Sequence, residues 1–125
     1  MAEQLNKHLI DVEVDGLVVG GYEKHQCGVT VKEGQNLKRG TILALDEDDK
    51  AVILGTESED ETPVVYAPKY ILAEDIDATD DDEVAIAYDR VTVVTDKVIV
   101  DEGYTLTSED IDELRIHNIF FEGEV

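Results

Sequence analysis

Carboxylates are the residues with the clearest chemical potential in this sequence, and they gather in three runs. The runs cover residues 46–49, 57–61 and 80–83. Several carboxylate oxygens from one loop could bind a hard cation such as calcium. An EF-hand loop does not fit. If such a loop began at Asp75, its sixth position would be Asp80 instead of glycine, and its twelfth would be Ile86 instead of glutamate. We therefore interpret the runs as solvated loop acids and expect no metal site.

A histidine and a cysteine two residues apart, His25 and Cys27, form the second candidate. On a strand they would share one face, where such a pair could bind a metal or activate a thiol. A four-ligand zinc site would need His8, His117 or distant carboxylates to converge on the pair. The sequence also has no nucleophile elbow and no glycine-rich phosphate loop. We interpret Cys27 as a small buried residue and His25 as a surface residue, and we expect neither catalysis nor a cofactor.

Length and composition limit the size of the fold and the class of partner. The 125 residues include 31 acidic and 10 basic side chains, which gives a formal net charge of -21. A surface of that charge repels phosphate backbones, so we expect no direct binding of nucleic acid. No apolar run approaches the roughly 20 residues of a membrane span, and the N-terminus is too polar for a signal peptide. The single cysteine excludes an internal disulfide framework.

The chain divides into an N-terminal segment and one compact domain. Residues 1–24 contain a short alternation of apolar and acidic residues, followed by several glycines. We interpret this segment as an extended arm with enough alternation for one strand. Residues 25–125 have the length of a single domain, and the chain is 42% hydrophobic, which is enough for one core.

The pattern of the 25–125 region is typical of a β-rich domain, because short β-branched runs alternate with turn residues. The run 91–100 is the strongest strand candidate, and Lys50 with the acids before it marks a hairpin tip. A helix is predicted to begin after Thr107 or Ser108 and to stop at Asn118. The expected fold class is mainly β, with one short C-terminal helix. The predicted strands cover residues 29–31, 41–45, 51–54, 64–66, 70–73, 84–88 and 91–100.

Three motifs occur in the order of one known family. The first is Gly-Val-Thr-Val at 28–31 with Leu-Lys-Arg-Gly-Thr-Ile-Leu at 37–43. The second is Pro-Lys-Tyr-Ile-Leu-Ala-Glu-Asp-Ile-Asp-Ala-Thr at 68–79, and the third is Ile-Asp-Glu-Leu-Arg-Ile-His-Asn-Ile-Phe-Phe at 111–121. In this order and spacing the motifs resemble bacteriophage head decoration proteins of the lambda D type. Asn118 stands where that family usually has glycine, and asparagine tolerates the same left-handed conformation.

The resemblance implies a structural virion protein that is not an enzyme. Its body would be a compact β-barrel or β-tulip, and it would form homotrimers at three-fold and quasi-three-fold positions on the outer surface of the phage head. There it would clamp neighbouring major capsid protein subunits against internal DNA pressure. The N-terminal arm would reach the capsid and add a strand to it, a mode in which backbone hydrogen bonds supply affinity and alternate side chains fill pockets.

Two sets of residues follow from this resemblance. The expected capsid-binding residues of the arm are Leu5, Leu9, Ile10, Val12, Val14 and Leu17. The expected trimer interface residues are aromatic side chains, because these offer a wide apolar face and are enriched at interfaces. They are Tyr66, Tyr70, Tyr88, Phe120 and Phe121.

An alternative rests on a second, shorter resemblance. The segment 31–43 followed by Asp-Lys-Ala at 49–51 is similar to the first half of a lipoyl or biotinyl carrier domain. In those domains a lysine at a hairpin tip is acylated, and Lys50 would be that lysine. A quasi-symmetric second half is missing from the sequence after this hairpin. The two readings differ in the intact mass of the chain, because acylation adds mass and capsid binding does not.

Overall fold

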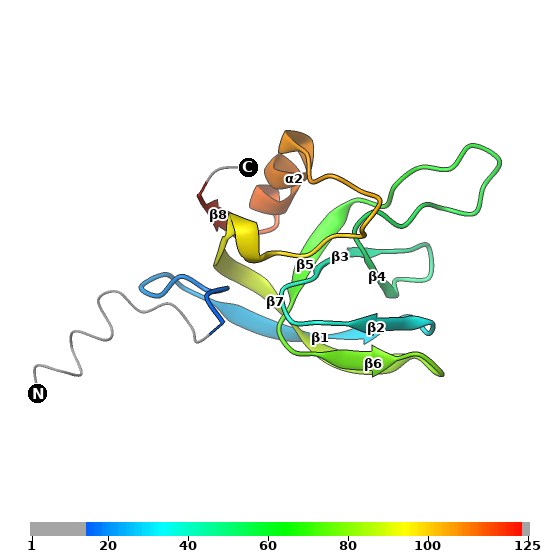
Figure 1. The fold of residues 1–125 in the computed structure, drawn as a ribbon, viewed down its shortest axis with the longest axis horizontal. Helices are drawn as coiled ribbons and strands as arrows, with labels where there is room; N and C mark the ends of the chain where they lie inside the picture. Colours follow the sequence, from blue (N-terminus) through cyan, green and yellow to red (C-terminus); the bar gives the residue numbers. More distant parts are fainter. Residues whose placement is uncertain (1–14, 124–125) are drawn as a thin grey trace, which may run out of the picture.

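The computed structural model describes residues 15–123 as a mostly β protein, with 43% in strands and 11% in helices. Figure 1 shows the strands gathered into one body, with helix α2 on one side of it. The strands are β1 (His25–Val31), β2 (Gln35–Leu37), β3 (Ile42–Leu45), β4 (Ala51–Ile53), β5 (Pro68–Leu72), β6 (Ile76–Ala78), β7 (Glu83–Val94) and β8 (Ile119–Glu122). The helices are the 3-10 turn η1 (Thr95–Lys97) and α2 (Ser108–Ile116).

Five strands close into a barrel in the order β1-β4-β3-β5-β7. The barrel closes because β7 is long enough to pair with β5 and also, antiparallel, with the whole of β1. The far end of β7 extends beyond the barrel and pairs in parallel with β8. The strands β2 and β6 form a separate two-stranded sheet. The predicted β-barrel with one C-terminal helix is confirmed.

Small residues fill the barrel interior, because a five-stranded barrel is narrower than the eight-stranded size that ordinary side chains fill. On β7 the alanines Ala85 and Ala87 are buried, whereas Val84 and Ile86 between them are 72% and 42% exposed. Valines and leucines from the other strands complete this cluster. The larger side chains Val84 and Ile86 therefore point away from the barrel interior. In most half-buried strands the larger apolar side chains face the core instead.

A second core cluster lies outside the barrel, under α2 and β8. It includes Ile71, Tyr88 and Leu114, all almost fully buried. Thr107 caps the helix: its side chain accepts from the Asp110 amide at 3.1 Å, and the Asp110 carboxylate accepts from the Thr107 amide at 3.0 Å. Asn118 has a φ of 69° and follows the helix, so the predicted start and stop of the helix are both confirmed.

Two of the predicted strands differ in the structure. The run 91–100 is interrupted, because β7 ends at Val94 and η1 turns the chain at Thr95. The Thr95 hydroxyl donates to the carbonyl of Glu122 at 2.9 Å, which fixes this turn against the end of β8. The run 64–66 forms only an isolated bridge between Glu57 and Val65. In both places tertiary contacts override a high local β propensity.

Candidate functional site

The chain joins the body at residues 15–19, a segment we call the arm root. Val18 forms an antiparallel bridge with Val93, the Val19 amide donates to Thr92 at 3.0 Å, and the Val94 amide donates to Leu17 at 2.8 Å. The end of β7 therefore has the arm root on one edge and β8 on the other. This three-stranded extension positions both the exit toward residues 1–14 and the side chains beside it.

Exposed aromatic side chains lie beside the arm root. Tyr22 is 56% exposed and Phe120 is 38% exposed. With Arg90 and Thr92 they line a groove of about 320 Å³, and Glu23 at its rim lies 3.7 Å from the Arg90 guanidinium. We call these five residues the arm-end surface. Aromatic residues and arginine are enriched among the residues that dominate protein–protein binding, so this surface has the chemistry of a protein interface.

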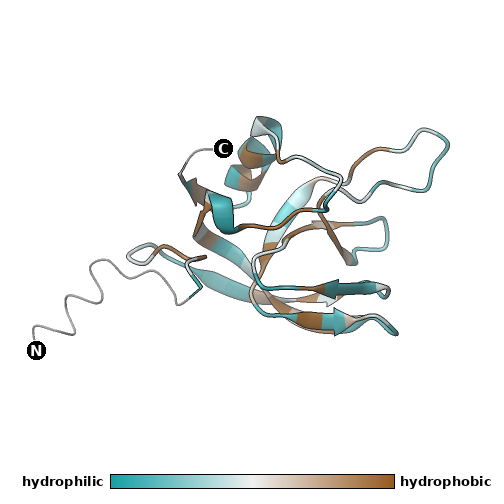
Figure 2. Cartoon of the chain, in the orientation of Figure 1, coloured by the Kyte–Doolittle hydropathy of each residue, from teal (hydrophilic) through white to brown (hydrophobic). Residues whose placement is uncertain are grey.

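The acidic loops lie at the opposite end of the body, which we call the acidic end. Figure 1 shows the loops 46–50, 54–67 and 79–82 on the side away from the arm root, and Figure 2 shows their tips in hydrophilic colours. The predicted hairpin tip at 46–50 is present between β3 and β4. The molecule therefore separates its aromatic groove from its densest negative charge.

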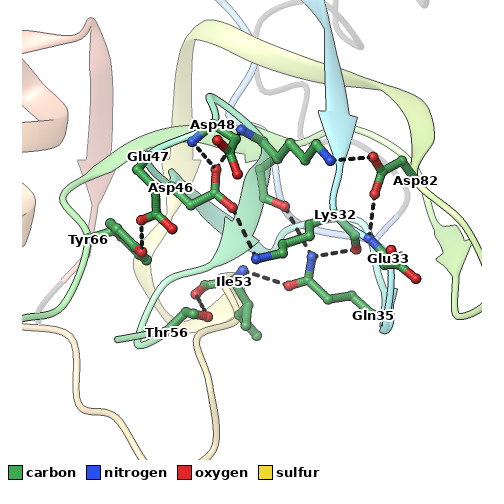
Figure 3. Close-up of polar contacts among 12 residues, drawn as sticks. Lys32, Glu33, Gln35, Asp46, Glu47, Asp48, Ile53, Thr56, Tyr66 and Asp82 are labelled. Carbon is green, nitrogen blue, oxygen red and sulfur yellow. Dashed lines mark hydrogen bonds and ion pairs between the residues drawn. The ribbon is translucent and has the colours of Figure 1, made fainter. Parts of the chain in front are cut away.

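Two lysines pair with aspartates of these loops (Figure 3). The Lys32 ammonium lies 3.4 Å from Asp46, and the Lys50 ammonium lies 2.7 Å from Asp82. Burial acts to raise the pKa of Asp46, but amides of Lys50 and Asp48 and the Lys32 ammonium outweigh it, and the pKa is lowered. Hydrogen bonding to Asp82 raises the pKa of Lys50. Lys50 thus joins two acidic loops, and Lys32 joins the turn after β1 to the first of them.

A glutamine organises the backbone beneath these ion pairs. The Gln35 amide nitrogen donates to the carbonyls of Lys32 and Ala51, each at 3.0 Å. Its side-chain oxygen accepts from the Ile53 amide, also at 3.0 Å (Figure 3). The turn after β1 is thereby tied to β4. The acylation alternative gains no support from this geometry, because the Lys50 amine is paired with Asp82 across the loops.

The expected trimer residues do not form one surface. Tyr66 is half-buried and donates to Glu47 at the acidic end, and Tyr70 is half-buried with the Lys69 ammonium 5.4 Å from its ring centre. Phe120 belongs to the arm-end surface, and Phe121 packs partly against the outer core. Tyr88 is corrected: it is only 2% exposed, and its hydroxyl accepts from the Arg39 guanidinium at 2.8 Å. It is a core residue and offers no side chain to a neighbour.

One of the expected arm residues lies within the described region, and the other five lie before it. Leu5, Leu9, Ile10, Val12 and Val14 lie outside the described residues 15–123. Leu17 is 2% exposed and belongs to the outer core cluster, so its expected capsid contact is corrected to a packing role. The described end of the predicted arm is therefore part of the body as far as Val18.

Three residues at the surface were not predicted from the sequence: the exposed Val84 and Ile86 and the half-buried Arg90. The alternation of alanine with larger residues along 84–87 was an available signal, since a narrow barrel takes the alanines inside. Tyr22 belongs to the aromatic residues that the sequence offers for packing and interfaces, whereas the sequence held no such signal for Arg90. They meet only because β7 extends past the barrel toward the arm root.

The structure also shows the surroundings of the residues considered for metal binding and thiol chemistry. Within residues 15–123, no group of three or more histidine, cysteine, aspartate or glutamate side chains could hold a metal ion. His25 pairs with Asp89 at 2.7 Å. Burial and the Asp89 charge raise the pKa of the Cys27 thiol, which keeps it protonated.

The described part of the chain contains no helix that is long and apolar enough to cross a membrane. The comparison with family models gives a match over nearly all of the described chain. The model of the bacteriophage lambda head decoration protein D family matches residues 15–119, from the arm root to the start of β8. Among curated proteins, no match was found.

Proposed function

The chain belongs to the bacteriophage lambda head decoration protein D family, and from this premise we propose that it is a trimeric cement for the outer face of the phage head. As a member of that family it is a structural protein of the virion that binds the capsid. Beyond this, we propose that homotrimers sit at three-fold and quasi-three-fold positions. There they clamp neighbouring major capsid protein subunits against the pressure of packaged DNA.

The observation that carries the proposal is the separation of surface chemistry between the two ends of the body. The arm root and the exposed Tyr22 and Phe120 share one end, and the acidic loops occupy the other. A chain of formal charge -21 approaches another protein best through its least charged end. We therefore propose that the arm-end surface faces the capsid and that the acidic end faces solvent.

Strand addition by the arm is consistent with how the arm root is already bound. Residues 17–19 pair with β7 through backbone hydrogen bonds, while Leu17 and Val18 bury their side chains. We propose that the alternating residues 9–14 make the same kind of contact with an exposed sheet edge of the capsid. Leu9, Ile10, Val12 and Val14 would supply its apolar side chains, with Leu5 beyond them.

The trimer places a constraint on the seam between subunits. Three copies bring together three strongly acidic chains, so the seam must bury apolar surface and keep the acidic loops apart. Among the expected residues, Phe120 and Phe121 lie on β8, which pairs with the end of β7, while Tyr66 contacts Glu47 within the acidic loops. We propose a seam that includes Tyr70 and Phe121, with Ile86 as a further exposed candidate, while Phe120 stays with the arm-end surface.

The test is deletion of residues 1–14. Both core clusters lie within residues 15–123, so the truncated protein should fold and keep the unfolding temperature of the full chain. Mixed with undecorated heads, it should fail to co-sediment with them, whereas the full chain should decorate them. Full decoration by the truncated protein would move the anchor from the arm to the body. Light scattering of the full chain and trimer-shaped density on decorated heads test the oligomer.

A further inference from the structure

The arm root is locked to the barrel through one carboxylate, that of Asp15. One of its oxygens accepts from the Leu17 amide at 3.2 Å, which closes a tight turn around Gly16. The other accepts from the Arg39 guanidinium at 2.6 Å. Gly16 has a φ of +75°, a conformation that L side chains rarely adopt. The first described residues, which follow position 14, are therefore held in a defined bend.

Arg39 is itself held by the barrel. A second nitrogen of its guanidinium donates to the carbonyl of Ala73 at 3.0 Å and to the hydroxyl of buried Tyr88 at 2.8 Å. The backbone amide of Arg39 donates to Asp75 at 2.8 Å. The Arg39 side chain is only 21% exposed, although it is the longest side chain in its turn. A side chain fixed at both ends transmits the position of the barrel to the arm root.

The next residue, Gly40, forms the second contact of the barrel with the arm root. It has a φ of +98°, and a Cβ atom here would lie 3.1 Å from the carbonyl oxygen of Lys97 and 3.5 Å from a methyl group of Leu17. Glycine therefore leaves the room that the buried Leu17 side chain fills. Arg39 holds the carboxylate of Asp15, and Gly40 receives the leucine two residues later.

We propose that the Arg39–Gly40 turn is a socket that sets the direction in which the chain leaves the body toward residues 1–14, with Asp15 as the positioning residue. This inference rests on the proposed function, because its consequence is felt when the arm binds the capsid. A fixed exit limits the orientations that the arm must give up on binding, which raises affinity without adding a contact to the capsid. The Arg-Gly pair of the 37–43 motif then serves arm placement as well as the barrel.

Variants of Asp15 can distinguish a positioning role from a purely structural one. Its side chain is 46% exposed, so its loss costs the core little, whereas loss of Arg39 also removes the partner of buried Tyr88. Asp15→Asn keeps an oxygen for the Leu17 amide and removes the charge that pairs with Arg39. Asp15→Glu keeps the charge on a longer side chain. Asp96→Asn is a matched control, because Asp96 is an exposed aspartate of η1, close to the arm root in the fold.

The experiment measures the binding of full-length variants to undecorated heads, together with unfolding temperature and backbone nuclear relaxation at Gly16. Asp15→Asn should lose affinity about three- to tenfold, because the arm then has more orientations to give up on binding, with greater motion at Gly16 and little change in unfolding temperature. Asp15→Glu should recover part of the affinity, and Asp96→Asn should bind like the unaltered protein.

The outcomes separate this inference from the proposed function. If the unaltered chain decorates heads and Asp15→Asn binds equally well, the socket does not position the arm and the proposed function stands. If Asp15→Asn loses affinity only together with a large fall in unfolding temperature, the contact is structural and the positioning role is overturned. If the unaltered chain does not bind heads, the proposed function fails, and the positioning role fails with it.

Discussion

The two ends of the barrel hold their segments together by different means. At the arm end, backbone hydrogen bonds and buried Leu17 and Val18 attach the chain to β7. At the acidic end, an ion pair from Lys50 holds two acidic loops together, and one from Lys32 holds the turn after β1 against loop 46–50. Backbone pairing and apolar burial are insensitive to salt, whereas exposed ion pairs weaken as salt rises. The arm end is therefore built for a durable contact, and the acidic end for solvent.

The largest expected effect is at the buried side of the arm end. Leu17→Ala should lower the free energy of unfolding by about 2–4 kcal/mol, because it leaves a cavity between Gly40 and the outer core. Denaturant unfolding measures the change. An equal truncation on the exposed side of the barrel, Ile86→Ala, serves as the control and should cost much less. Similar losses for both variants would mean that residues 15–19 are not part of the folding unit.

The exposed side of the arm end should affect binding instead of folding. Tyr22→Ala removes a 56% exposed ring from the groove, so we expect an unfolding temperature close to that of the unaltered protein. Its affinity for undecorated heads should fall about ten- to hundredfold, the range for an aromatic residue at the centre of an interface. Tyr66→Phe, a change at the acidic end, is the control and should leave affinity unchanged. If Tyr22→Ala binds with unaltered affinity, the groove is not part of the capsid contact.

The acidic end offers a test of its ion pairs through pH. Asp46 is almost fully buried, and its pKa is lowered in the folded protein, so its charged form stabilises the fold above the unfolded pKa near 3.8. That stabilisation is lost as pH falls through the lower, folded pKa. Asp46→Asn should cost about 1–2 kcal/mol at pH 7. The difference in stability from the unaltered protein should shrink as pH falls below 3.8 and through the lower pKa of folded Asp46. A gap that stays constant with pH would show that the charge of Asp46 contributes nothing.

The contrast between the two ends also explains what the sequence could predict. Local signals were sufficient for the capping box at Thr107, the left-handed stop at Asn118 and the hairpin tip at Lys50, because each depends on neighbours a few residues away. The barrel and its family followed from motifs in order along the chain. The acidic loops were expected at the surface, and they lie there except for Asp46, which is buried.

Local sequence signals could not predict the contacts between segments that are distant along the chain. Tyr88 was expected at the surface because aromatic residues are common at interfaces, but Arg39, which is far away in sequence, draws its hydroxyl into a buried network. Leu17 was expected in the arm because glycines follow it, and only the space left at Gly40 makes it a core residue. The run 91–100 contains enough β-branched residues for one strand, yet the contact between Thr95 and β8 ends it early. In each case the deciding partner is remote along the chain.

The smallest expected effect concerns the rate at which the protein reaches the head. If the arm end makes the contact, the acidic end acts only through its long-range field, which slows the approach to any negatively charged surface. Raising the salt concentration to about 0.15 M shortens the Debye length to roughly 8 Å, so association should become a few times faster while dissociation stays nearly constant. Backbone pairing and apolar contacts, which hold the bound state, are not screened. Surface binding kinetics on immobilised heads measure both rates.

A charge-reduced variant turns this salt effect into a test of the two-ended arrangement. Glu59→Gln, Asp60→Asn and Glu61→Gln together remove three exposed charges from the tip of one acidic loop. At low salt this variant should associate faster than the unaltered protein, and its association rate should depend less on salt, because part of the repulsive field is gone. Its dissociation rate should not change, since residues 59–61 lie at the end opposite the arm root. A steep loss of affinity with salt in both proteins, or faster dissociation of the variant, would instead mean that ion pairs at the acidic end hold the protein to the head.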